Sequence, residues 1–279
     1  MYTGGWIKII TDEETINITD KVSGFMFLEA KAAYPTTNND SITVKGVDGE
    51  LPSSATFAPF NLVVKCGFDG YDTKDANLAE QELRNIFYKR KPYYVVTSDN
   101  PNIKYAVRNP DINPDYTDYR AIRFEINFSV FKGYSESIDD TSQFSLSNGR
   151  WQFESGVLAT PDVHYSHDHT AFRIYNGSSD TVNPIMRHNF KLIIHAAAPK
   201  GLKITNTTTG DVFEYKEPLN YANELVINGV HPFLDRKQRV GKYTNFEWIT
   251  LAPGYNQIVI TGENIKKVQT EWIFNFIYR

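Results

Sequence analysis

The ten residues from Leu251 to Ile260 constrain the fold more than any other stretch of the sequence. Pro253 and Gly254 form a turn dipeptide, in which glycine supplies a backbone conformation that other residues avoid. Asn256 has a side chain suited to hydrogen bonds with the local backbone. The residues that follow alternate between apolar and polar, which is the pattern of a half-buried strand. A tight turn that feeds such a strand indicates a β-sandwich.

The rest of the second half repeats this design, with short alternating runs separated by turn residues. It contains no helical pattern, and residues 206–211 have the composition of a hairpin loop. Regular short strands with turn signals predict a β-sandwich. We expect its strands near residues 151–154, 163–165, 171–175, 188–196, 202–205, 211–215, 224–227, 244–251, 256–261 and 267–278.

The first half is predicted to contain strands and one helix. Asp75 is the expected N-cap of this helix, and Pro92 ends the helical pattern. Its apolar face, at helical spacing, consists of Leu78, Leu83, Ile86 and Phe87. We expect strands at 6–10, 16–18, 22–28, 42–45, 60–68, 93–97, 105–108 and 122–131, a turn at 46–49 and another at 100–101, and loops at 34–41 and 109–118.

The length of 279 residues favours two domains. Residues 134–148 are rich in Ser, Asp and Thr, so we place the boundary there and expect domains at 1–137 and 138–279. Residues 1–137 hold 15 basic and 19 acidic side chains, a net charge of −4, whereas the remainder holds 14 of each. Neither domain has the basic excess of a nucleic-acid binder.

The single cysteine, Cys66, lies in an apolar run and is predicted to be a buried small hydrophobe. No disulfide can form within the chain. We find neither a signal peptide nor an apolar run near the ~18 residues of a membrane span, and we expect a soluble protein made in a reducing cytoplasm.

The sequence offers few candidates for chemistry. His164, His167, Asp168 and His169 have metal-ligand side chains, and His167 and His169 would share one face of a strand. No further ligands stand at a motif spacing, so we expect a polar loop. Neither the pair Asp139–Asp140 nor the 109–118 loop matches a calcium loop. With no nucleophile elbow, phosphate loop or dinucleotide fingerprint, we expect no catalytic, cofactor-binding or metal residues, no cofactor, and no enzyme activity.

Carbohydrate binding is a rival hypothesis, because sugar sites use exposed aromatic faces beside polar groups. Trp151, Trp248 and Trp272 lie in the second half, but the alternating patterns around Trp248 and Trp272 favour burial in the core. A glycan hydrolase is a third hypothesis, for which the sequence selects no carboxylate pair.

The order and spacing of several segments resemble siphophage distal tail proteins over nearly the whole chain. Residues 132–133 depart from the resemblance, since many relatives have an acidic residue and a proline there. The segments are Trp6–Leu28, Val47–Gly49, Leu78–Tyr88, Phe124–Phe128, Tyr134–Ser135, Gly156–Pro161, Ile227–Gly229, Leu251–Ile260 and Trp272–Tyr278.

The resemblance implies a mainly β protein with an N-terminal ring-forming belt domain and a C-terminal galectin-like β-sandwich. It implies a homohexameric hub in the virion, at the distal end of the phage tail, assembled in the host cytoplasm. The implied partners are the tail tube protein, a tail-associated lysin or tail fibre, and a receptor-binding protein on the outer domain. DNA would only pass through the channel, and no membrane is involved. The alternative is a cell-wall carbohydrate-binding module for host adsorption without a ring.

Overall fold

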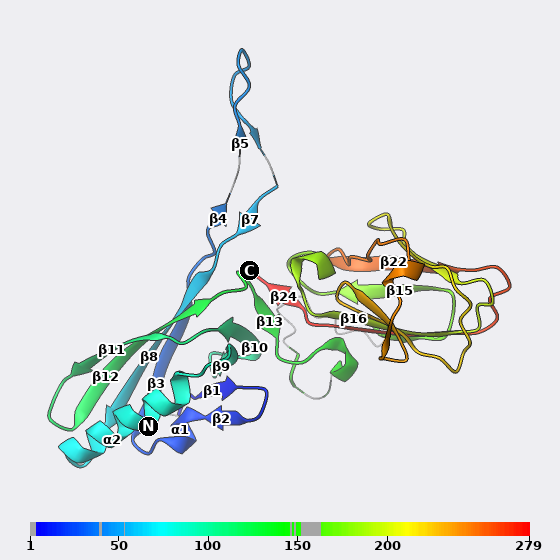
Figure 1. Ribbon diagram of the computed structural model, residues 1–279. Coiled ribbons are helices and arrows are strands. Elements are labelled where there is room, and N and C mark those ends of the chain that lie inside the picture. The colour runs from blue at the N-terminus through cyan, green and yellow to red at the C-terminus, as the bar shows by residue number, and fades with distance from the viewer. Residues whose placement is uncertain (1–3, 39–40, 53, 146, 148, 152–162) are drawn as a thin grey trace. The chain divides into compact units, whose positions relative to one another are not determined.

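The computed structural model describes residues 4–38, 41–52, 54–145, 147, 149–151 and 163–279. The chain divides into two compact units, Met1–Glu136 with Arg279, and Ser137–Tyr278. Both consist mainly of antiparallel strands, which confirms the predicted mainly β class (Figure 1). Among the described residues, no helix has the length and apolar character needed to cross a membrane.

The first unit is built on one antiparallel sheet. Its main strands run in the order β2-β1-β9-β10-β12-β8-β3, and β11 pairs with β12. The short helix α1 (Ile18–Lys21) follows β2. The strands are β1 (Ile7–Ile10), β2 (Thr15–Asn17), β3 (Phe25–Ala32), β8 (Phe60–Asp69), β9 (Tyr93–Thr97), β10 (Asn100–Val107), β11 (Asp111–Tyr116) and β12 (Ala121–Val130), with β13 (Ser135–Ser137) after them.

Helix α2 (Thr73–Phe87) covers one face of this sheet (Figure 1). Its N-cap is Asp72, and the prediction of Asp75 was wrong. Asp72 has an extended backbone, so its carboxylate accepts hydrogen bonds from the next free N–H groups, at 2.8 Å from Lys74 N and 3.0 Å from Asp75 N. Of the predicted apolar face of the helix, Leu83, Ile86 and Phe87 are buried, whereas the side chain of Leu78 is 62% exposed.

The core of the first unit lies between α2 and the inward faces of the long strands β8 and β12. These strands pair residue by residue, for example Val64 with Ile126. The predicted alternation in β12 is confirmed, and the ring of Phe128 packs edge-on against Phe87 of α2 at 5.6 Å. The inward side chains of the two strands are buried: Leu62, Val64, Cys66, Phe68, Ile122, Phe124, Ile126 and Phe128.

Residues 109–118 were predicted to be a loop but mostly form β11, which pairs with β12 from Asp111↔Asn127 to Tyr116↔Ile122. Pro114 is tolerated because β11 is an edge strand and needs no N–H on its outer side. The predicted turn at 100–101 was also wrong, since β10 already begins at Asn100.

The described residues between 33 and 59 form a long two-stranded hairpin, which we call the arm (Figure 1). Thr37, Asn38 and Ser41 of the predicted loop 34–41 are strand residues, and the predicted strand 42–45 was wrong beyond Ile42. The predicted turn 46–49 lies at the tip of the arm. Its strand pairs are β4 (Thr37–Asn38) with β7 (Thr56–Phe57), and β5 (Ser41–Ile42) with β6 (Leu51–Pro52).

The second unit is a two-layer β-sandwich, as predicted. One sheet has the order β14-β23-β16-β19-β20-β21 and the other β15-β22-β17-β18. Trp272 lies fully buried, 6.1 Å from the ring of Phe172 in the opposite sheet. The strands are β14 (Ser166–His167), β15 (Ala171–Asn176), β16 (Phe190–Ala196), β17 (Leu202–Asn206), β18 (Asp211–Tyr215), β19 (Leu225–Asn228), β20 (His231–Leu234), β21 (Gln238–Arg239), β22 (Gly254–Thr261), β23 (Val268–Phe274) and β24 (Ile277–Tyr278).

In the described part of this unit, short 3-10 helices accompany the strands: η1 (Thr141–Gln143), η3 (Pro184–Met186) and η4 (Gly241–Tyr243). The expected strand 244–251 is wrong, since only isolated bridges at Thr244 and Leu251 occur there. Side-chain hydrogen bonds hold this segment instead, such as Asn245 Nδ2 to the carbonyl of Val212 at 2.7 Å. The expected strand 163–165 is absent too, and strands β20 and β21 were not predicted. Residues 152–154 and 156–161 lie outside the described residues.

Three asparagines fix the Leu251–Ile260 stretch from within the sandwich. Asn256 is fully buried, and its side chain bonds both backbone groups of Ala252, at 2.9 Å to N and 2.8 Å to O. Asn206 donates to Asn256 Oδ1 at 3.0 Å, and Asn176 donates to the carbonyl of Leu251 at 2.8 Å. The side chain of Asn256 therefore satisfies both backbone groups of Ala252, and Asn176 adds a second donor to the carbonyl of Leu251, which also pairs with Val182.

Candidate functional site

The arm exposes apolar side chains that the first unit does not bury. Between residues 33 and 59, every described residue is exposed except Pro35 and Ala58, which are half-buried. A two-stranded hairpin is marginally stable in water by itself, and each exposed apolar side chain gains free energy when another surface covers it. The exposed large apolar residues of the arm are Tyr34, Ile42, Val44, Val47, Leu51 and Phe57.

Exposed apolar side chains are unevenly divided between the two units. Among the described residues, thirteen large apolar side chains of the first unit are exposed, against four of the second. Contiguous exposed apolar surface is typical of protein–protein contacts. The exposed large apolar residues of the second unit are Ile185 and Met186 of η3, Phe246, and Tyr255 of β22.

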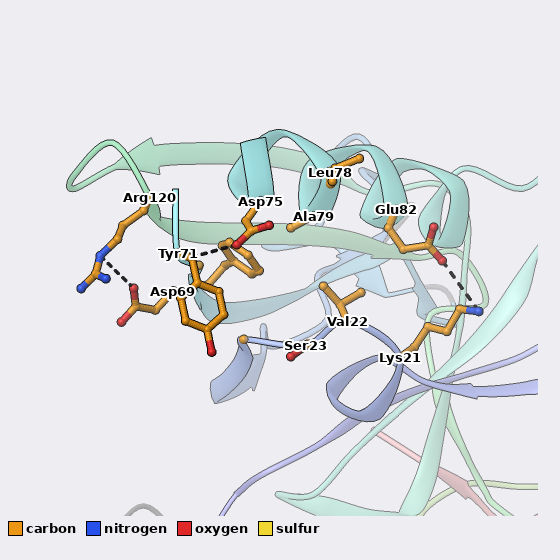
Figure 2. Close-up of a pocket in the computed structure, with 13 residues that line it drawn as sticks. Lys21, Val22, Ser23, Asp69, Tyr71, Asp75, Leu78, Ala79, Glu82 and Arg120 are labelled. Carbon is orange, nitrogen blue, oxygen red and sulfur yellow. Dashed lines mark hydrogen bonds and ion pairs between the residues drawn. The ribbon is translucent and has the colours of Figure 1, made fainter. Parts of the chain in front are cut away.

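A groove of about 690 Å³ runs between α2 and the segment that follows α1 (Figure 2). Ion pairs close its rim, with Lys21 3.9 Å from Glu82 and Arg120 3.5 Å from Asp69. The side chain of Tyr71 is 91% exposed beside it. The lining mixes charged and apolar groups: Lys21, Val22, Ser23, Gly24, Phe68, Asp69, Gly70, Tyr71, Asp75, Leu78, Ala79, Glu82 and Arg120. This mixed composition suits contact with another protein.

A smaller pocket of about 300 Å³ lies on the other side of α2, against β11. Its floor is apolar and includes Leu83, Ile112 and Phe124, and its rim carries Glu80 and Arg84, which form an ion pair at 2.5 Å. Tyr116 of β11 donates a hydrogen bond from its hydroxyl to Glu80. The unpredicted edge strand is thereby tied to the helix.

Lys132 and Gly133, where the sequence departs from the resemblance, belong to a buried polar cluster. Lys132 Nζ donates hydrogen bonds to both carboxylate oxygens of Glu136. It also donates to the hydroxyl of Tyr94, at a distance of 3.1 Å. Burial lowers the pKa of Lys132, but the charge and hydrogen bond of Glu136 outweigh it, so the net shift is upward. Burial, reinforced by Glu136, raises the pKa of Tyr134 to about 12. No sequence motif marks this cluster.

Cys66 lies on the inward face of β8, 1% exposed, as predicted. Burial raises the pKa of its thiol well above the ordinary value of 9.0. A buried neutral thiol is a poor nucleophile. Among the described residues, no three or more His, Cys, Asp or Glu side chains are grouped as metal ligands.

The structure brings the predicted histidine cluster together at the edge of the sandwich. The ring of His167 stacks on Phe172 at 4.2 Å and 11°, and the ring of His169 lies 5.8 Å from that of His167. Burial lowers the pKa of His167. Asp168 and His169 are exposed.

The tryptophans of the second unit offer no open sugar platform. Trp151 is buried, and Trp272 is buried as predicted. Trp248 was also expected in the core, but its side chain is only half-buried. The ring of Trp151 packs edge-on against Phe276 at 5.1 Å.

A protein family model described as the phage tail protein RIFT-related domain matches residues 12–130. A comparison with curated protein sequences gives no significant match. Among solved structures, the Dit (gp 19.1) protein of phage SPP1, described as a paradigm of the hub adsorption apparatus in phages that infect Gram-positive bacteria, aligns with a TM-score of 0.68. The alignment covers 97% of this chain and 99% of that one at 12% identity, and it establishes a shared fold.

Two structures of the phage p2 baseplate in its activated conformation also align with this chain. The structure with Ca has a TM-score of 0.46 at 11% identity and covers 97% of this chain and 98% of its own. The structure with Sr has a TM-score of 0.45 at 11% identity and covers 96% of this chain and 97% of its own. At these scores they add nothing to the fold assignment.

Proposed function

We propose that this chain, whose residues 12–130 match the phage tail protein RIFT-related domain, is the distal tail hub of a long-tailed phage. Six copies would form a ring that joins the tail tube to the tail-tip and host-recognition proteins. The observation that supports this most is the shared fold with SPP1 Dit across nearly the full length of both chains.

The arm is the segment we assign to the contact between copies. A closed ring needs heterologous interfaces, in which one face of each subunit meets a different face of the next. Ile42, Val44 and Leu51 stand exposed on the arm, at 64%, 40% and 58%, beyond the reach of the core of their own unit. In the ring, the next copy would cover these side chains and remove their apolar surface from water.

The charge of the first unit is compatible with a channel for DNA. Residues 1–137 have a net charge of −4, which repels a polyanion and favours its passage without adhesion. The second unit, with its exposed Ile185 and Met186, would dock a tail-associated lysin, tail fibre or receptor-binding protein. Trp151 and Trp272 are buried there and Trp248 is half-buried, which supports docking of a protein over the carbohydrate-binding alternative.

Antibody labelling of intact phage particles tests this location. Gold-labelled antibody raised against the purified chain is expected at the tail end that lies opposite the head. Labelling along the tail, labelling of the head, or no labelling of particles shown to contain the chain would contradict the proposal. Disruption of the tail tip before labelling guards against an epitope that neighbouring proteins cover.

A further inference from the structure

The two histidines at the edge of the sandwich have an arrangement that the proposed hub function does not use. His167 belongs to edge strand β14, and His169 lies in the bend that leads to β15. Phe172 contacts both rings, stacked against His167 at 4.2 Å and edge-on to His169 at 6.4 Å. The same aromatic side chain therefore restricts the orientation of both imidazoles.

The hydrogen bonds of the two rings determine which nitrogens are free. His167 Nε2 lies 3.0 Å from the carbonyl oxygen of His164, which only accepts, so this nitrogen holds the proton. His169 Nδ1 lies 2.5 Å from Oδ1 of Asp168, and an ionised carboxylate likewise only accepts. In the neutral rings, His167 Nδ1 and His169 Nε2 are consequently left with their lone pairs.

This pattern matches the surroundings of histidines that bind metals. Such histidines donate their second ring N–H to a carboxylate or a backbone carbonyl, which fixes the tautomer and raises the basicity of the ligating nitrogen. Here one ring has the carbonyl of His164 and the other has the carboxylate of Asp168.

The separation of the rings also fits one shared ion. An ion about 2.1 Å from one nitrogen of each ring lies about 3.2 Å from each ring centroid, so two ligand rings stand about 5 to 6 Å apart. The observed separation is 5.8 Å. We propose that His167 and His169 form a two-imidazole site for a divalent transition metal ion such as Zn²⁺ or Ni²⁺, at the edge of the β-sandwich.

The site is open to solvent. The side chain of His169 is 63% exposed and that of Asp168 is 84% exposed, so an ion can enter without a change of fold. Since no third protein ligand joins the pair among the described residues, water fills the other coordination positions and the affinity is modest. Imidazole selects Zn²⁺, Ni²⁺ and Cu²⁺ over Mg²⁺ and Ca²⁺, which prefer oxygen ligands.

Calorimetric titration of the full chain, produced without a histidine tag, tests the site. We expect saturable binding of one Zn²⁺ per chain in the micromolar range and no binding of Mg²⁺. His167→Ala and His169→Ala should each abolish it. Asp168→Asn should weaken it about tenfold, because it removes the carboxylate that orients His169. His231→Ala, at an exposed histidine of β20, is the matched control and should bind as the unmodified chain does.

Circular dichroism of each variant confirms that it is folded, and His169→Ala is the safer variant because its side chain is largely exposed. Cobalt provides a second readout, since imidazole coordination changes its visible spectrum. Failure of the unmodified chain to bind Zn²⁺ would overturn the proposal. Retention of full binding by folded His169→Ala would do the same.

Discussion

Lys132 Nζ lies 2.8 Å from Oε2 and 2.9 Å from Oε1 of Glu136, and the side chain of Glu136 is only 1% exposed. Gly133 lies between the two residues with φ of +72°, and a Cβ there would stand 3.0 Å from the carbonyl oxygen of Phe57 at the root of the arm. The ion pair thus closes a turn that packs against the base of the arm.

Breaking this pair is expected to destabilise the protein strongly. Glu136→Gln leaves the Lys132 charge without its anion, and a broken buried pair costs about 3 kcal/mol of unfolding free energy. The control is Glu263→Gln, which breaks the exposed pair with Lys200 and should cost below about 1 kcal/mol. Urea denaturation measures both, and equal losses in the two variants would contradict a buried ion pair.

Asn256→Ala is expected to lower the unfolding free energy by about 3 kcal/mol, because it removes a fully buried amide and leaves the half-buried N–H and carbonyl of Ala252 without their side-chain partners. Gln257→Ala, at the exposed neighbouring position of β22, should change it by less than about 0.5 kcal/mol. Thermal or urea unfolding distinguishes the two. A loss at Asn256 as small as that at Gln257 would show that water replaces the amide.

Cys66 predicts a pH dependence of stability with a definite sign. Burial raises the thiol pKa in the folded chain, whereas the unfolded chain titrates near the ordinary value of 9.0. The unfolded state alone loses the proton above that value, so stability falls as the pH rises, by about 1.4 kcal/mol per unit.

Between pH 7 and pH 10, the natural chain should therefore lose about 1 to 2 kcal/mol more unfolding free energy than Cys66→Ala. The comparison between the two chains removes the contribution of tyrosines and lysines. Parallel pH profiles, or reaction of the folded chain with a thiol reagent, would contradict a buried neutral thiol.

Local sequence patterns predicted the fold correctly where the buried residues recur at the spacing of a single strand or helix. The alternation from Ile122 to Val130 appears unchanged in β12 because one face of that strand meets α2. Asn256 bonds the local backbone, as its place after a Pro-Gly turn indicates. β11 was missed because Pro114 and its acidic neighbours resemble a loop, although an edge strand tolerates all of them.

The candidate surfaces depend on tertiary position, which local patterns do not contain. Ile42, Val44 and Leu51 have the composition of ordinary core strand residues, yet they lie on an arm that leaves the sheet. Leu78 fits the helical spacing of core residues but faces outwards, and Lys132 and Glu136 resemble an exposed i,i+4 pair. The side-chain types of His167 and His169 indicate possible metal ligands from sequence alone. Which nitrogen of each ring carries the proton follows only from the hydrogen bonds in the structure.

The solution mass of the purified chain, measured by light scattering over a range of concentrations, tests the central claim most directly. We predict a particle of about six times the 31.9 kDa monomer, or a mass that rises towards it with concentration. The arm variant Ile42→Ser/Val44→Ser/Leu51→Ser should remain folded and monomeric, whereas the control Ile185→Ser/Met186→Ser should assemble as the natural chain does. A natural chain that stays monomeric at every concentration, or an arm variant that assembles normally, would contradict the account.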